Sequence, residues 1–81
     1  MVTCVEAIIE AFQDLGGTRS FDDIEKWILK RYGARWKRST IETNMADMVP
    51  EYLDGPSTSN VRTHLRVLRR VGPGIYRLIM Q

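Results

Sequence analysis

The sequence predicts a mainly helical α+β domain, in which three short helices precede a β-hairpin at the carboxyl end. Three observations predict it. A helix-start signature occurs three times, apolar residues follow each signature at helical spacing, and two branched or aromatic runs flank a glycine-rich turn near the end of the chain. With 81 residues the chain can bury one modest core, so we expect residues 1–81 to form a single domain.

Each predicted helix starts with a hydroxyl residue three positions before a carboxylate. In this capping box the hydroxyl oxygen accepts a hydrogen bond from a backbone N–H of the first turn, and the carboxylate accepts one from the N–H of the cap residue. The helix dipole also favours a negative charge at this end. The three pairs are Thr3 with Glu6, Ser20 with Asp23, and Ser39 with Glu42.

Apolar residues recur at helical spacing after each pair, so each helix has one apolar face. They are Val5, Ile8, Ile9, Phe12 and Leu15 in the first helix, Phe21, Ile24, Trp27 and Ile28 in the second, and Ile41, Met45 and Met48 in the third. Gly16, Gly33 and Pro50 end the helices, because glycine closes a helix in the left-handed conformation and proline cannot continue one.

The segment after the third helix, residues 49–60, is rich in turn formers and predicts a loop. We expect Tyr52 and Leu53 to fix this loop on the core. A further short helix from Ser59 through Leu65 is an alternative for its end.

The last part of the chain predicts a β-hairpin. Residues 65–71 and 75–79 are branched and aromatic, and the glycine-rich turn at residues 72–74 separates them. Two strands alone are marginally stable, so the hairpin must pack on the helices. Residues 18–19 are placed to add a short third strand. The order helix, short strand, helix, helix, hairpin is that of a winged helix-turn-helix.

The sequence also resembles small prokaryotic winged-helix proteins that occur alone or attached to restriction-type nucleases. The resemblance lies in residues 20–28, 39–41 and 70–78, and its most specific part is the closing Val-Gly-Pro-Gly-Ile-Tyr-Arg-Leu. It implies that the third helix, over about residues 39–48, enters the major groove of DNA. It also implies that the hairpin, the wing at about residues 65–79, contacts the neighbouring backbone.

The charges are unevenly distributed along the chain. The formal net charge is only +2. Residues 1–25 carry six carboxylates against one arginine, whereas residues 26–81 carry eleven cationic side chains against four carboxylates. A chain of this kind can present a basic face to a polyanion, although the charges can equally well serve only to solvate the surface.

The residues that we expect to contact DNA lie around the third helix and in the wing. Cations beside the positive end of a helix suit phosphate, and short polar side chains reach base edges, where asparagine can pair with adenine. For Lys37 and Arg38 ordinary solvated charge is the alternative, for Asn44 a core contact, and for Trp36 packing is favoured over stacking on a base. The predicted set is Arg35, Lys37, Arg38, Ser39, Thr40, Thr43 and Asn44, with Arg66, Arg69 and Arg70 in the wing.

The wing region contains arginines and no carboxylate after Asp54; Arg62 and Arg77 also belong to it. The alternative is that arginines on an edge strand prevent unwanted sheet pairing. Glu42 and Asp47 on the third helix oppose DNA binding. A homodimer would relieve this by doubling the basic footprint, and we expect its contact on the acidic first helix.

The sequence therefore favours a protein that binds double-stranded DNA, such as a small transcription regulator. A protein-interaction adaptor and binding to structured RNA are the alternatives. We expect no enzyme activity, cofactor or small-molecule substrate, because the sequence has no glycine-rich phosphate loop or metal-ligand cluster, and His64 has no nucleophile partner. Cys4 is the only cysteine, which excludes an internal disulfide. With no apolar run of about 20 residues and no signal sequence, we expect a cytoplasmic protein without membrane contact.

Overall fold

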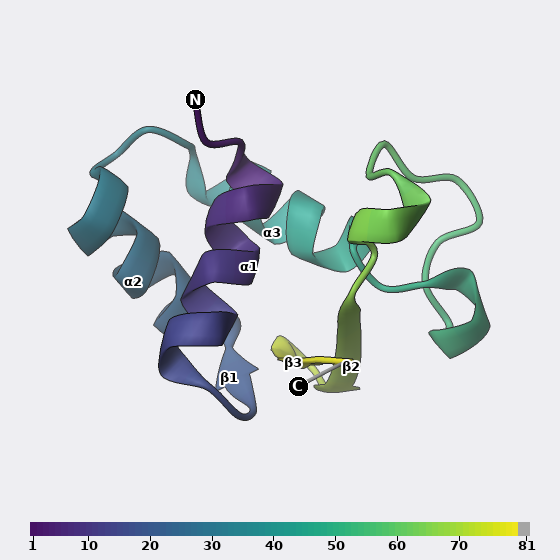
Figure 1. Cartoon of the computed structure of the whole chain (residues 1–81). Coiled ribbons are helices and arrows are strands. Elements are labelled where there is room, and N and C mark those ends of the chain that lie inside the picture. The colour runs from purple at the N-terminus through teal and green to yellow at the C-terminus, as the bar shows by residue number, and fades with distance from the viewer. Residues whose placement is uncertain (80–81) are drawn as a thin grey trace.

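A computed structural model describes residues 1–79 of the chain and shows an α+β fold with three helices and a three-stranded antiparallel sheet. The elements are α1 (Cys4–Leu15), β1 (Arg19–Ser20), α2 (Phe21–Tyr32), α3 (Arg38–Asp47), the 3₁₀ turns η1 (Glu51–Leu53) and η2 (Thr63–Leu65), β2 (Leu68–Gly72) and β3 (Ile75–Leu78). In the view of Figure 1, α1 lies in front of α3, α2 lies to one side and the sheet lies below. Residues 80–81 of the predicted domain lie outside the described residues.

Local capping positions α1 and α2, as the sequence predicts. In α1 the Thr3 N–H donates to Glu6 Oε1 at 2.8 Å, and the Glu6 N–H donates to Thr3 Oγ1 at 3.2 Å. The same reciprocal pair joins Ser20 and Asp23 at the start of α2. Each helix ends at a glycine with a φ of 72°, a value that glycine adopts without strain. Two of the three predicted capping boxes are therefore confirmed.

The third predicted capping box is wrong. α3 begins at Arg38, one residue before Ser39, and within residues 1–79 no side chain caps its first turn. Its first hydrogen bonds run from the N–H groups of Thr40 and Ile41 to the Lys37 carbonyl, at 3.0 and 3.1 Å. Ser39 therefore lies inside the first turn with its side chain exposed. The cause is tertiary, because ion pairs of Arg38 with α2 fix the start of this helix.

The core forms where the apolar faces of the three helices meet the inner face of the sheet. The largest side chains that are less than 2% exposed are Phe12, Ile8, Ile24, Ile28, Ile41, Met45, Met48 and Leu68. All but Leu68 belong to the predicted helical faces. Val5, Ile9, Leu15 and Trp27 from those faces pack against this core but are only partly buried.

The sheet has the order β1–β3–β2, so the last strand lies in the middle. Arg19 pairs with Tyr76, which confirms the predicted third strand one residue later than expected, and Leu68 pairs with Leu78. The N–H of Phe21 donates to the Gly74 carbonyl at 2.8 Å and ties the hairpin turn to the start of α2. The arrangement is compatible with a winged helix.

The segment between α3 and β2 differs from its prediction in three ways. The hairpin begins at Leu68 and not at residue 65, and the helix considered from Ser59 is only the single turn η2. Tyr52, which we expected on the core, is 77% exposed, whereas Leu53 does pack against the core. Backbone groups here are satisfied by a side chain from across the loop: Arg66 Nη2 donates to the carbonyls of Val49 and Pro56.

Matched serine substitutions test the difference between the two helix starts. We expect Ser20→Ala to lower the free energy of unfolding by about 1 kcal/mol, because it removes a cap. Ser39→Ala should leave it unchanged or raise it by up to about 0.5 kcal/mol, because alanine is the better helix former inside a first turn. Urea denaturation measures both variants. Equal losses would mean that Ser39 caps α3 after all.

Candidate nucleic-acid interface

The outer face of α3 is polar and hollowed. Ser39, Thr40 and Thr43 are exposed there. Together with Asn44 they line a shallow hollow of about 240 Å³. We call these four residues the α3 polar face. Asn44 is half-buried and its side-chain amide lowers the pKa of Cys4 in α1, so one side of this amide faces the core. The apolar residues of α3 lie on its opposite side, where Ile41 and Met45 are buried.

The three cations that precede or start α3 lie in different environments. Arg38 is held by α2: its guanidinium pairs with Asp22 Oδ1 at 3.1 Å and Glu25 Oε1 at 2.7 Å, and it lies 4.7 Å from the Phe21 ring centroid. Lys37 is exposed and makes no ion pair with any residue that the structure describes. Arg35 is exposed. Arg38 therefore fixes the α2–α3 corner, and Lys37 and Arg35 carry the uncompensated charge.

Aromatic rings support this corner from the α2 side. Arg35 lies over the rings of Tyr32 and Trp36, with centroid distances of 5.4 and 5.3 Å. The Trp36 ring meets the Tyr32 ring edge to face, with centroids 5.8 Å apart, and packs against the core. This supports the packing role that the sequence favoured for Trp36. The stack also holds the Arg35 guanidinium near the start of α3.

The acidic side chains of α1 are hydrogen-bonded within the chain. Trp27 Nε1 donates to Asp14 at 2.7 Å, and the Tyr32 hydroxyl and Arg31 both donate to Glu10. The hydrogen bond to Glu10 is the main reason why the pKa of Tyr32 is raised. These contacts join α1 to α2 and give no support to a dimer contact at this acidic row, which stays a prediction.

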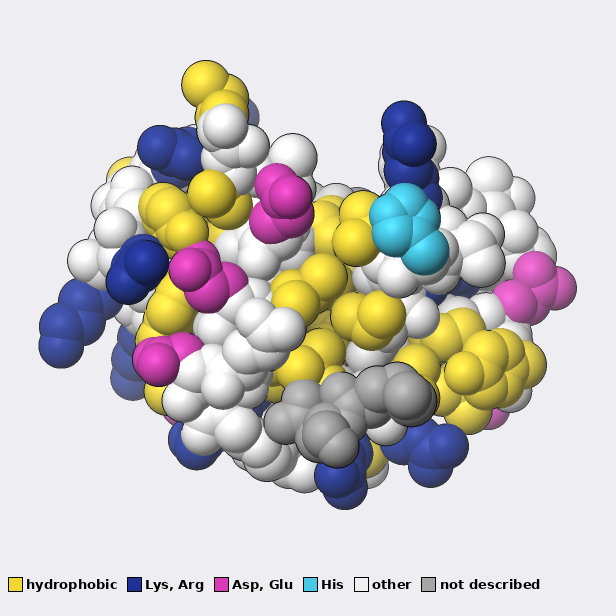
Figure 2. Space-filling view, viewed as in Figure 1, with side chains coloured by type: hydrophobic (Ala, Val, Ile, Leu, Met, Phe, Trp, Pro, Cys, Tyr) yellow, Lys and Arg dark blue, Asp and Glu magenta, His cyan; other side chains and the backbone are white. Residues whose placement is uncertain are grey.

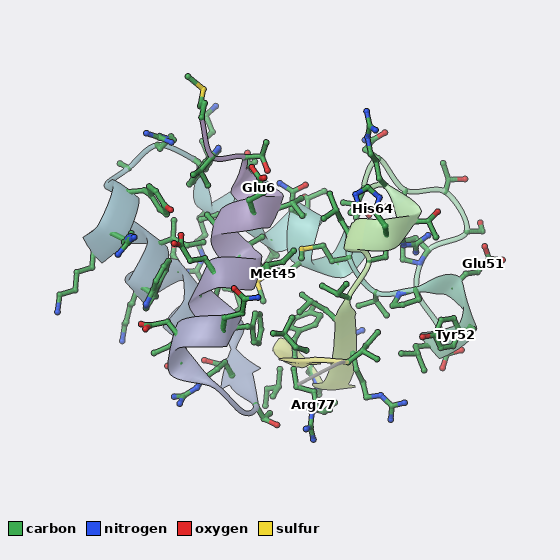
Figure 3. All side chains as sticks on the ribbon, viewed as in Figure 1. Glu6, Met45, Glu51, Tyr52, His64 and Arg77 are labelled. Atoms are coloured by element: carbon green, nitrogen blue, oxygen red, sulfur yellow. The ribbon has the colours of Figure 1, made fainter. Side chains whose placement is uncertain are left out.

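The wing presents two arginines side by side. Arg69 of β2 and Arg77 of β3 are directly opposite in the register, and both are exposed. Figure 3 shows Arg77 pointing away from the core. Like charges at opposed positions destabilise a sheet, and an anion bound between the two arginines would offset their repulsion. Sequence reasoning noted Arg77 but left it out of the site, because only the strand register shows that it neighbours Arg69.

The other two predicted wing arginines are placed differently. Arg70 lines a hollow of about 250 Å³ together with Ala46 of α3, and its Nε donates to the Gly72 carbonyl at 3.3 Å. It therefore brings the wing next to the carboxyl end of α3, where the Asp54 carboxylate lines the same hollow. Arg66 is half-buried and is bound to backbone carbonyls of the loop, a structural role that the sequence did not predict.

Three of the ten carboxylates, those of Glu6, Glu10 and Asp14, belong to α1. Figure 2 shows carboxylates over α1, with Lys and Arg side chains around the edges of that view. Near the α3 polar face the exposed carboxylates are Glu42 of α3 itself and Asp22, whose charge faces Arg38.

The comparisons with known proteins identify no relative. A scan against protein-family models, a search of curated proteins and a search of solved structures gave no match for this chain. Across residues 1–79, no helix has the length and apolar character to cross a membrane. The same residues contain no group of three or more His, Cys, Asp or Glu side chains that could hold a metal ion.

The environment of Cys4 predicts a slow thiol. Burial raises its pKa, and the hydrogen bond with Asn44 offsets this only in part. Because the thiolate is the reactive form, we expect iodoacetamide at a pH of about 8 to modify the folded protein at least tenfold more slowly than the urea-unfolded chain, by roughly the protection that burial gives. Mass spectrometry measures both rates. Equal rates would show that the first turn of α1 is open in solution.

Proposed function

We propose that the chain is a winged helix-turn-helix domain that binds double-stranded DNA, with α3 in the major groove and the β2–β3 wing on the adjacent backbone. The observation that carries the proposal is the α3 polar face, residues 39, 40, 43 and 44. Short side chains with hydroxyl and amide groups occupy the solvent side of a helix, where they can hydrogen-bond base edges. A small regulator of transcription is the function that fits this reading best.

The helix propensities of the residues on that face also support the proposal. Serine, threonine and asparagine are poor helix formers, each about 0.5 kcal/mol worse than alanine in an exposed helical position. They also offer few of the charge pairs that stabilise surface helices. α3 has no side-chain cap among residues 1–79 and is still built from such residues. These residues at exposed positions lower the stability of the helix. Such a loss is expected where residues are retained for binding.

The surrounding cations suit a duplex backbone. Lys37 and Arg35 lie at the positive end of α3, where phosphate binding is favoured. Beyond the carboxyl end of α3, Arg70 shares a hollow with Ala46 and the Asp54 carboxylate, and Arg69 and Arg77 extend the positive charge along the sheet. Phosphate contacts at both ends would position the helix, while the α3 polar face would provide the sequence discrimination.

Salt-dependent binding tests the proposal. We expect a labelled random-sequence duplex to bind in fluorescence anisotropy, and the affinity to fall by at least tenfold between about 50 mM and about 200 mM salt as counterions are released. Arg69→Ala with Arg77→Ala should weaken binding to all sequences and reduce the salt slope by up to about 2.

The matched control for this variant is Lys26→Ala with Lys30→Ala, which removes the same charge from exposed positions on α2. It should leave most of the affinity intact. If both double variants lose affinity equally, only net charge matters and the wing has no special role. Absence of binding at low salt would contradict the proposal and favour a protein-interaction adaptor. A preference for RNA hairpins over duplex DNA would favour RNA binding.

A further inference from the structure

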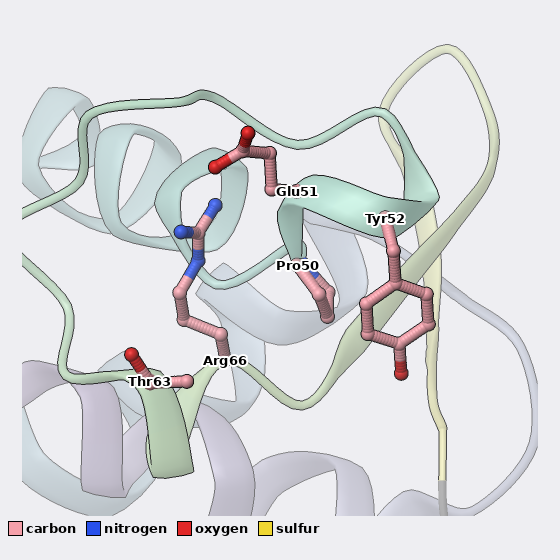
Figure 4. A pocket seen from close by; sticks show the side chains of 5 residues that line it. All are labelled: Pro50, Glu51, Tyr52, Thr63 and Arg66. Atoms are coloured by element: carbon pink, nitrogen blue, oxygen red, sulfur yellow. The ribbon is translucent and has the colours of Figure 1, made fainter.

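A large hollow lies away from the α3 polar face, between the two 3₁₀ turns. It has a volume of about 620 Å³ and is lined by Pro50, Glu51, Tyr52, Thr63 and Arg66 (Figure 4). We call it the η1–η2 hollow. A volume of this size is within the range of small-molecule sites.

The η1–η2 hollow is polar at one end and apolar at the other. In Figure 4 the Glu51 carboxylate and the Arg66 guanidinium point toward each other, and Pro50 lies between Arg66 and Tyr52. The two charged groups do not form one of the ion pairs within residues 1–79. The Tyr52 ring is 77% exposed, so its face is open to contact.

Arg66 is a preorganised anchor in this hollow. Its Nη2 donates to the Val49 and Pro56 carbonyls, which fixes the guanidinium on the loop. Its Nε is buried and has no acceptor in the part of the chain that the structure describes. The buried Nε is itself out of reach of a ligand, so an oxygen anion would meet the end of the guanidinium that faces the hollow, which the two hydrogen bonds of Nη2 hold in place. The nearby Glu51 carboxylate, which would repel a phosphate or a nucleic acid, instead favours a ligand that also carries a cation.

We propose that the η1–η2 hollow binds a small zwitterion with an aromatic side chain, of the class of the aromatic amino acids. The ligand carboxylate faces Arg66, its ammonium group faces Glu51, and its ring packs against the exposed ring of Tyr52. Both charges of the ligand and its ring then meet a complementary group in one hollow. The inference does not depend on DNA binding.

An NMR titration of the full ¹⁵N-labelled chain tests this with three probes: L-phenylalanine, L-phenylalaninamide, which lacks the carboxylate, and 3-phenylpropanoate, which lacks the ammonium group. We expect saturable shifts at residues 50–53 and 62–66 with L-phenylalanine, with a Kd on the order of 1 mM or below. The two other probes should bind at least fivefold more weakly. No saturation up to about 10 mM, or equal binding of all three, would overturn the proposal.

Variants at exposed positions separate the roles of the lining residues; Arg66 stays unchanged because it also holds the loop. Glu51→Gln should weaken L-phenylalanine but not 3-phenylpropanoate, and Tyr52→Ala should weaken both. Glu42→Gln on α3 is the matched control and should change neither. If Glu51→Gln strengthens every probe, Glu51 closes the hollow on Arg66 in solution, and the zwitterion site is overturned.

Discussion

Burial of the apolar face of α3 is the constraint on which the rest of this structure depends. Ile41, Met45 and Met48 are at most 1% exposed, and they pack with the buried face of α1. A chain of 81 residues is long enough for only one such core. A ten-residue helix without a side-chain cap among residues 1–79 would be marginal in isolation. Tertiary packing therefore holds α3 in place, and this packing also determines which of its side chains face solvent.

The α2–α3 corner supplies the second part of this constraint. Arg38 bridges Asp22 and Glu25 while lying over the Phe21 ring, so one side chain orients the start of α3 against the start of α2. The same end of α2 is tied to the hairpin turn by the Phe21 N–H. Exposed ion pairs are weak singly, but here one guanidinium serves two carboxylates and a ring. The start of α3 and the turn of the wing therefore both contact the beginning of α2.

Sequence reasoning succeeded where the determinants are local and failed where they are tertiary. The capping boxes at Thr3 and Ser20 and the glycine stops depend on neighbours within four residues, and they were predicted correctly. The start of α3 was predicted wrongly, because Arg38 pairs with carboxylates that lie more than ten positions away in the sequence. The long-range contacts of Arg66 were beyond prediction for the same reason.

The candidate site shows the same division. The α3 polar face follows from helical periodicity alone, so the sequence could identify its members. The adjacency of Arg69 and Arg77 depends on strand register, and the η1–η2 hollow depends on how two 3₁₀ turns meet. Neither leaves a pattern in a single sequence. Arg38 and Arg66, which a charge count groups with the binding residues, turn out to hold the fold together.

The central claim is that the α3 polar face serves binding at the expense of stability. The most direct measurement is the double variant Ser39→Ala with Thr43→Ala, followed by urea denaturation and by DNA anisotropy at a single salt concentration. We expect the free energy of unfolding to rise, by up to about 1 kcal/mol, since alanine is the better helix former at both positions. The account predicts a DNA affinity that falls by about tenfold, the equivalent of about 1.4 kcal/mol of lost contacts. A variant that binds DNA as tightly as the parent protein would contradict the account.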